Sequence, residues 1–201
     1  MKQDEYFTIT AAKQADIKIK GSRFIGTAAH VTDEDEAKNF IREIAGRYHD
    51  ATHNCFAYVV GFPPQQIARF NDDGEPAGTA GQPILSVIQG QNLNFVAVVV
   101  TRYFGGTKLG KGGLIRAYSD CTRAVLENCR IEKRYIYEKI SIVFPYDLTG
   151  VVMRTISQFS AKVDQSIYDQ DSRLRVSVRR SVADDFRKQL IEVTSDKLTF
   201  L

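Results

Sequence analysis

Glycine is concentrated in one part of this chain. Nine of its 14 glycines lie between Gly74 and Gly113, about one fifth of the 201 residues, and four of its five prolines lie between Pro63 and Pro83. Glycine is used where the backbone takes a positive φ or where another group approaches it closely. Loops with these requirements carry binding and catalytic residues more often than regular elements do. We therefore expect function to lie in this window.

The composition is that of an ordinary soluble globular protein, with a net charge of +3, 43% hydrophobic and 25% charged residues. The length allows one large domain or two small ones. The three cysteines lack C-x-x-C spacing, which argues against a disulfide scaffold or a zinc ribbon and fits a reducing cytoplasm. No signal peptide is recognised, and the longest apolar run, residues 95–100, is too short to span a bilayer, so no membrane association is predicted.

The first half of the chain alternates β-prone runs with amphipathic stretches. These patterns predict, in order, a hairpin over residues 16–31, a helix from Asp33 to residues 46–50, a strand over 55–60, a loop over 69–83, a short helix over 84–88 and a buried strand over 95–101. A second glycine loop over 105–113 leads into a helix, whose predicted inward face is Leu114, Tyr118, Cys121, Val125 and Asn128.

The pattern changes near residue 138. The predicted elements are a strand over 140–144, a helix capped by Asp147, strands over 162–168 and 174–178, a helix over 182–190 and a strand over 198–201. This β-α-β-β-α-β order is that of a ferredoxin-like domain. We therefore predict a mixed fold (α/β, or α+β) with an N-terminal domain over residues 1–137 and a ferredoxin-like domain over residues 138–201.

Charge is polarised within the first domain. Residues 33–75 carry a local charge of −5 and residues 102–134 a local charge of +5. Arg116, Arg123 and Arg130 recur every seven residues and share one helix face, which would suit a phosphate backbone. Pairs of the type Arg116–Asp120 and Arg123–Glu127, spaced i,i+4, favour an ordinary solvated surface instead.

The second glycine loop resembles a phosphate-binding G-x-x-x-x-G-K motif at Gly105, Gly110 and Lys111, between a strand and a helix. Gly112 replaces the metal-binding hydroxyl of that motif, which disfavours a standard nucleotide hydrolase. Backbone N–H groups, a helix N-terminus, Lys108 and Lys111 still favour an anion site. The alternative is a glycine turn that packs the strand against the helix.

Two further groups are candidates for chemistry. Asp72, Asp73 and Glu75 could hold Mg²⁺, although Asp73-Gly74 favours a plain turn and no metal site is assigned. His53 and Cys55 share one face of a strand start, but a catalytic dyad would need an orienting partner that the sequence does not supply. A packed cysteine beside a capping histidine is the favoured interpretation.

Three segments carry a family resemblance. They are Ala51-Thr52-His53-Asn54-Cys55-x-Ala57-Tyr58, Asn71-Asp72-Asp73-Gly74-Glu75-Pro76-x-Gly78-Thr79-Ala80-Gly81-x-Pro83 and Thr101-Arg102-Tyr103-Phe104-Gly105-Gly106-x-Lys108-Leu109-Gly110-x-Gly112-Gly113-Leu114. These segments resemble the signature of the IMPACT family, in its two-domain bacterial YigZ form. The resemblance extends over essentially the whole chain.

The resemblance implies more about fold than about chemistry. Family members are similar to domain 2 of ribosomal protein S5 in their N-terminal part and to the last domain of the translocation factor EF-G in their C-terminal part. Eukaryotic relatives regulate translation by binding a ribosome-associated coactivator of an amino-acid-starvation kinase. No catalytic residue is carried over and no cofactor is implied.

Two functional hypotheses follow. The first is a module that binds RNA or a ribosome-associated protein in translation or its regulation. The second is an enzyme or a binder of a small phosphoryl ligand. The residues proposed for ligand binding are Arg102, Gly105, Gly106, Lys108, Gly110, Lys111, Gly112, Gly113 and Arg116, with a second loop of Asp72, Asp73, Glu75, Thr79 and Gly81, and His53 as a further signature residue.

Overall fold

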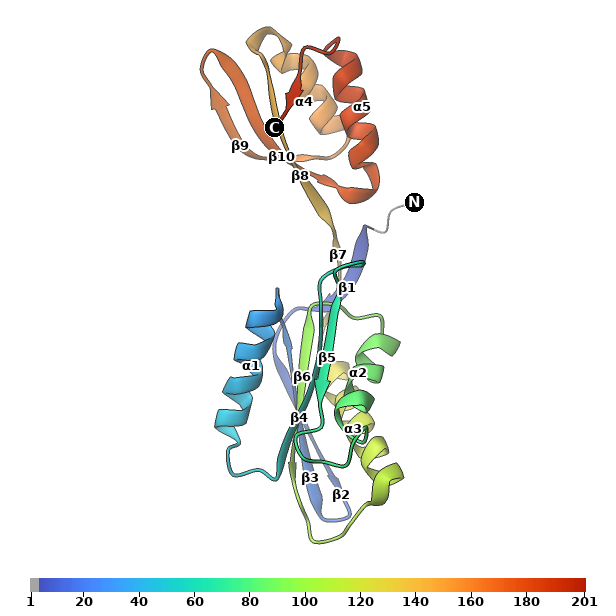
Figure 1. Cartoon of the computed structure of the whole chain (residues 1–201). Helices are drawn as coiled ribbons and strands as arrows, with labels where there is room; N and C mark the ends of the chain where they lie inside the picture. The colour runs from blue at the N-terminus through green and yellow to red at the C-terminus, as the bar shows by residue number, and fades with distance from the viewer. Residues whose placement is uncertain (1–3) are drawn as a thin grey trace. The chain divides into compact units, whose positions relative to one another are not determined.

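The computed structural model describes residues 4–201, which form two compact units (Figure 1). One unit comprises residues 6–133, and the other comprises residues 4–5 together with residues 134–201. Strands β1 (Glu5–Ile9) and β7 (Ile131–Tyr135) pair as a separate two-stranded sheet. No helix within the described residues is long and apolar enough to cross a membrane.

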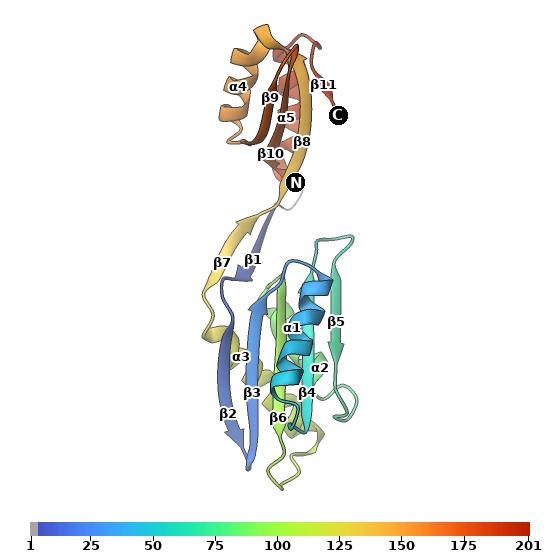
Figure 2. The ribbon, with the colours of Figure 1, turned by 90° about the vertical axis from the view of Figure 1, so that its left-hand side faces the viewer.

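The unit of residues 6–133 is built on a five-stranded antiparallel sheet. Its strand order is β2 (Lys13–Ile19), β3 (Ser22–His30), β6 (Val96–Tyr103), β4 (His53–Val60) and β5 (Ile67–Asn71). Helices α2 (Gly81–Gly90) and α3 (Gly110–Glu127) cover one face, and α1 (Glu34–Arg47) lies alone on the other (Figure 2).

The buried strand predicted over residues 95–101 is β6, which lies at the centre of the sheet. Residues 96–102 of β6 are all buried, because helices cover both faces of the sheet there. The larger core lies between the sheet and α2 and α3, with Phe24 and Tyr118 among its fully buried side chains. A smaller core lies beneath α1 and includes Tyr58 and Ala97.

The helix predictions need two corrections in this unit. Helix α2 extends over residues 81–90 rather than 84–88. In α3 the side chains of Leu114, Tyr118, Cys121 and Val125 are buried as predicted, but Asn128 is exposed and is the C-cap residue. Leu126 and Cys129 complete the buried face instead. A sequence period of three and four positions does not reveal where the helix ends, so the last position was misassigned.

The second unit has the predicted β-α-β-β-α-β order. The elements are β8 (Tyr137–Pro145), α4 (Thr149–Gln158), β9 (Lys162–Tyr168), β10 (Asp171–Arg179), α5 (Ala183–Val193) and β11 (Thr199–Phe200), with a sheet order of β11-β8-β10-β9. Its core joins apolar residues of the sheet, such as Ile142, to residues of both helices, such as Val152 and Phe186.

Two local predictions are wrong. Asp147 does not cap α4: it lies in a 3₁₀ turn (Tyr146–Leu148), and the N-cap position is Leu148, which makes no side-chain cap. Thr149 donates to the carbonyl of Tyr146 instead. Residues 69–71 do not belong to a loop, because they end the short edge strand β5, whose side chains are at most half-buried and show no apolar alternation.

Candidate functional site

The two glycine-rich loops meet at one end of the five-stranded sheet. In the antiparallel registers Arg102 lies opposite His53 on β4 and opposite Phe24 on β3, so the end of β6 adjoins the beginnings of both neighbours. Beyond β6, the backbone of Gly105 rests on the β2–β3 turn. A Cβ at Gly105 would lie only 1.9 Å from the carbonyl carbon of Gly21. Glycine at this position is therefore required by backbone packing.

A buried ion pair links the loops. The Arg102 guanidinium Nη1 lies 2.5 Å from Oε1 of Glu75, and both side chains are almost fully buried. The Tyr118 hydroxyl of α3 donates to the same Glu75 oxygen at 2.8 Å. Arg102 also donates to Ser22 Oγ at 3.4 Å. A buried charge is tolerated when it is paired and hydrogen-bonded, and Glu75 meets both conditions.

His53 and Cys55 have separate partners. Cys55 is fully buried, and its thiol donates to the carbonyl of Asp72 at 3.0 Å, with the Tyr118 hydroxyl oxygen also within reach of the sulfur at 3.3 Å. Burial raises the pKa of the Cys55 thiol, so it is not a nucleophile at neutral pH. His53 Nδ1 lies 2.6 Å from the carbonyl of Asp73. This arrangement agrees with a packed cysteine beside a histidine that binds the loop backbone.

The acidic loop uses its carboxylates to hold its own backbone. Asp72 accepts hydrogen bonds from the N–H groups of Gly78, Ala80 and Gly81 at 2.8–2.9 Å, at the N-terminus of α2. Burial opposes ionisation of Asp72, but these N–H groups outweigh it and lower its pKa. Asp73 accepts from the N–H of Asn54 at 2.6 Å.

The Asp72, Asp73 and Glu75 carboxylates therefore face different donors. Within residues 4–201, no three Asp, Glu, His or Cys side chains converge as metal ligands do. Thr79 is buried and donates to the carbonyl of Pro76 at 2.6 Å. At Gly81 a Cβ would lie 2.7 Å from the carbonyl oxygen of Asn71, so this glycine also serves close backbone packing.

The basic loop is exposed. Helix α3 begins at Gly110 after Leu109, which provides no side-chain cap, and its first turn contains no acidic residue. A Cβ at Gly106, Gly110 or Gly112 would meet no atom within 4 Å. At Gly113 a Cβ would touch the Leu109 side chain at 3.1 Å. Lys108, Lys111 and Arg116 are exposed and form no ion pair with another described side chain. The loop and the first two turns of α3 thus present uncapped N–H groups and three cations to solvent.

Two sequence predictions about the basic segment are wrong. Arg102 was placed on an exposed basic surface, but its residue exposure is 5% and its charge is matched by Glu75. Of the four cations proposed for ligand binding, Lys108, Lys111 and Arg116 remain on the surface. Asp120 pairs with Arg123 at 2.8 Å, spaced i,i+3, rather than with Arg116.

The sequence interpretation also missed two members of the buried network. Tyr118 was assigned to the core by its spacing alone, although its hydroxyl joins Glu75 to Cys55. The signal was a tyrosine at a core position, because a buried hydroxyl needs a partner where phenylalanine would not. Ser22 was assigned only to the hairpin over residues 16–31; its hydroxyl also accepts a hydrogen bond from the N–H of Gly105 at 3.1 Å.

Comparison with known proteins agrees with this architecture. Residues 20–126 match the Impact N-terminal domain, and residues 142–197 match a domain of unknown function (DUF1949). The IMPACT family member YvyE of Bacillus subtilis is 36% identical over 192 residues, covering 96% of this chain and 88% of that protein. The IMPACT family member YigZ of Escherichia coli is 34% identical over 92% of this chain and 91% of that protein.

A solved structure described as the crystal structure of a hypothetical protein has 30% sequence identity and a TM-score of 0.72, covering 99% of this chain and 97% of its own. The matches define a two-domain protein with an Impact-type N-terminal domain. The chain belongs to the IMPACT family, as a two-domain member of the YigZ type.

Proposed function

We propose that this protein is a binding module that acts in translation or its regulation, and that the basic glycine loop contacts RNA or a ribosome-associated protein. The observation that carries the proposal is the exposed start of α3, where uncapped N–H groups lie beside Lys108, Lys111 and Arg116. Helix N-termini attract anions through their free N–H groups and the helix dipole. Nearby lysines add the charge that gives salt-dependent binding to a phosphate backbone.

The open glycines support this role. Gly106 and Gly110 have positive φ angles of 85° and 72°, and no atom occupies the space where their Cβ atoms would stand. The space at the Cβ position of Gly112 is also empty, although its φ is not positive. Internal packing therefore does not explain all glycines of the loop, whereas it does explain Gly105. An absent Cβ lets a ligand approach the backbone.

The proposal also includes two fold similarities and a domain boundary. We infer a similarity of residues 1–137 to domain 2 of ribosomal protein S5 and of residues 138–201 to the last domain of EF-G, with the domain boundary near residue 137. Both comparisons come from the family resemblance. They support a role near the ribosome, because the similar domains occur in a ribosomal protein and a translocation factor.

Cosedimentation with ribosomes and filter binding to RNA, across a series of salt concentrations, test the proposal. The variant Lys108→Glu/Lys111→Glu should weaken binding. The slope of log K against log salt concentration should become shallower by about 2, one for each lysine lost. Lys188→Glu/Lys197→Glu makes the same charge change at exposed positions of the second unit and serves as the control. Binding that is absent, or unchanged in the loop variant, contradicts the proposal. Binding to ribosomes that survives nuclease treatment would identify a protein partner.

The alternative of an enzyme or a phosphoryl-ligand binder that uses Asp72, Asp73 and Glu75 receives no support from the geometry. All three carboxylates already accept hydrogen bonds from the protein, each from different donors. We therefore retain the binding module as the conclusion.

A further inference from the structure

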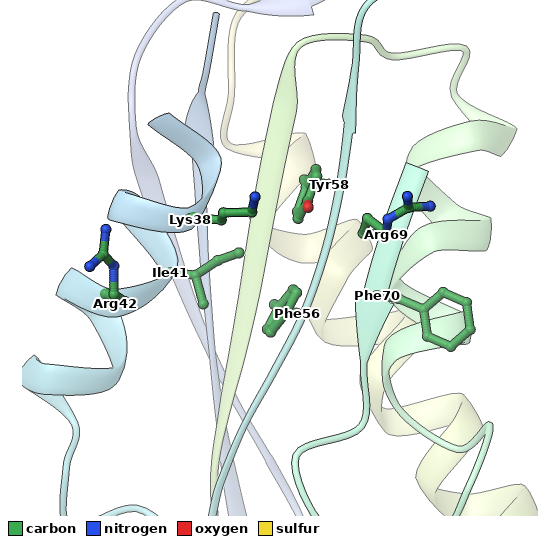
Figure 3. Close-up of a pocket in the computed structure, with 7 residues that line it drawn as sticks. All are labelled: Lys38, Ile41, Arg42, Phe56, Tyr58, Arg69 and Phe70. Atoms are coloured by element: carbon green, nitrogen blue, oxygen red, sulfur yellow. The ribbon is translucent and has the colours of Figure 1, made fainter. Parts of the chain in front are cut away.

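The face of the sheet that carries α1 is only partly covered. Strands lie about 4.8 Å apart and a helix is about 10 Å wide, so one helix covers roughly two of five strands. Beside α1, over β4 and the edge strand β5, a cavity of about 440 Å³ remains. Figure 3 shows its lining, which consists of Lys38, Ile41, Arg42, Phe56, Tyr58, Arg69 and Phe70.

The floor of the cavity is aromatic. Phe56 and Tyr58 are two positions apart on β4 and share a face, and their rings are nearly parallel, with an interplanar angle of 11° and centroids 6.3 Å apart. Ile41 of α1 closes the apolar side (Figure 3). Phe56 is partly exposed and Tyr58 is only 3% exposed, so Phe56 offers the accessible aromatic contact for a flat ligand.

The rim of the cavity is cationic. Lys38 pairs with Glu34 at 3.1 Å, and Glu34 also accepts from the Tyr58 hydroxyl at 2.9 Å. These hydrogen bonds, first that from Tyr58 and then that from Lys38, lower the pKa of Glu34 and keep it ionised. Its charge therefore offsets one of the three cations.

The other two cations contact only neutral oxygens. Arg42 donates to the side-chain carbonyl of Asn39, and Arg69 donates to the backbone carbonyl of Ala68 at 3.4 Å. Neither forms an ion pair with a carboxylate of the described chain. Three cations and one carboxylate leave a local charge of +2 around an apolar floor.

We propose that this cavity binds a phosphate monoester carrying a flat aromatic ring, of the class of the nucleoside monophosphates. The ring would pack against Phe56, with the buried Tyr58 beneath it, and the phosphate would be bound by the exposed side chains of Arg42 and Arg69 at the rim. A phosphate monoester carries a charge of about −1.5 to −2 at neutral pH, which complements the cavity's +2. The volume falls in the range of about 300–1,000 Å³ that is typical of small-molecule sites.

This site is separate from the basic glycine loop. Residues 56, 58 and 69 face α1, whereas α3 and the larger core lie on the opposite face of the sheet. The inference therefore does not depend on the proposed function. Variants of the cavity and variants of the basic glycine loop therefore test the two proposals separately.

Isothermal titration calorimetry with the four ribonucleoside 5′-monophosphates tests the proposal, with adenosine and inorganic phosphate as partial ligands. We expect at least one monophosphate to bind with a Kd in the millimolar range or tighter, and more tightly than adenosine or phosphate alone. The variant Arg42→Ala/Arg69→Ala should raise that Kd roughly tenfold or more, because both charged hydrogen-bond donors are lost. Both side chains are exposed, so the variant should fold.

Arg173→Ala/Arg175→Ala removes two exposed arginines from the second unit and is the matched control, for which the Kd should not change. Phe56→Leu keeps an apolar floor but removes one ring, and it should weaken the nucleotide while leaving phosphate binding as it was. Absence of binding by all four monophosphates overturns the proposal. So does binding that is lost in Lys108→Glu/Lys111→Glu but kept in Arg42→Ala/Arg69→Ala, which would place the ligand at the glycine loop.

The same chemistry could come from a free nucleotide or from the phosphorylated end of an RNA chain. Competition by short oligoribonucleotides with and without a 5′-phosphate separates the two sources. A 5′-phosphorylated strand that displaces the mononucleotide, while the unphosphorylated strand does not, identifies RNA ends as ligands. Failure of both strands to compete identifies the free mononucleotide as the ligand.

Discussion

Glu75 and Arg102 form a buried ion pair that joins the two glycine-rich loops. Glu75 belongs to the loop before α2, and Arg102 belongs to the end of β6, immediately before the loop that leads into α3. Tyr118 of α3 donates to the same carboxylate. The two signature segments are thus joined by one buried network. The backbone of the basic loop and its lysines lie outside this network and are exposed.

Removing one partner of this pair should be costly. In Arg102→Met the Glu75 carboxylate would stay buried without its cation, and loss of one partner of a buried pair costs about 3–5 kcal/mol. We expect the free energy of unfolding, measured by urea denaturation at pH 7, to fall by about that amount.

An exposed pair provides the control for this measurement. Arg123 and Asp120 are 2.8 Å apart but half-exposed, so Arg123→Met should cost about 0–1 kcal/mol. The double variant Glu75→Leu/Arg102→Met removes both charges and should recover part of the loss. Equal costs for Arg102→Met and Arg123→Met would show that the buried pair does not organise the loops.

Two glycines of the basic loop should respond oppositely to alanine. In Gly105→Ala the new Cβ would lie 1.9 Å from the backbone of Gly21, so the β2–β3 turn must move and stability should fall by several kcal/mol. In Gly112→Ala the Cβ enters open space in the first turn of α3, and stability should rise by about 0.4–1 kcal/mol. Thermal and urea denaturation measure both changes.

The same pair of variants separates packing from ligand binding. If a ligand approaches the loop backbone as proposed, Gly112→Ala should weaken RNA or ribosome binding even though it stabilises the fold. Stabilised protein with undiminished binding would show that the ligand does not approach the backbone at Gly112.

The elements with strong local patterns were predictable from sequence. The buried strand, the helix after the second glycine loop and the β-α-β-β-α-β order follow from apolar spacing, because burial of one face imposes the period. Strand β5 was missed, since its five residues at the edge of the sheet need no such alternation. The cap at Asp147 was misassigned because an acidic residue before a helix also suits the 3₁₀ turn found there.

The site was predictable only in outline. Sequence spacing located both loops, but it could not show that Arg102 pairs with Glu75, because the contact bridges 27 positions and depends on sheet register. Local charge counting therefore overestimated the exposed basic surface by one arginine. The cavity beside α1 was also missed, since its residues come from one helix and two strands and form no contiguous motif.

Asp72 should make stability depend on pH. Its pKa is lowered in the folded protein, where N–H groups of Gly78, Gly81 and Ala80 outweigh the effect of burial, and the unfolded value is 3.8. A lowered carboxyl pKa stabilises the fold above the unfolded pKa, and this contribution is lost as pH falls through the folded pKa. Relative to wild type, Asp72→Asn should lose about 1.5–3 kcal/mol at pH 7, and the difference should shrink below pH 3.8.

Urea denaturation of both proteins from pH 7 down to pH 2.5 measures this difference. Asp169→Asn, an exposed residue in the β9–β10 turn, should change the free energy of unfolding by less than about 0.5 kcal/mol at any pH. A difference for Asp72→Asn that stays constant through the acid range would mean that the hydrogen bonds do not depend on the carboxylate charge.

The three thiols should be unreactive in the native protein. Cys55, Cys121 and Cys129 are all buried, and burial raises the pKa of each thiol, to about 12 for Cys121. Because only the thiolate reacts, labelling by Ellman's reagent at pH 8 should require opening of the fold, whereas urea should release all three thiols at once. Cys129 is 9% exposed and should label first, so Cys129→Ser should remove the fastest phase. Rapid native labelling of Cys55 would contradict its burial between Asp72 and Tyr118, and with it the closed network that holds the two loops together.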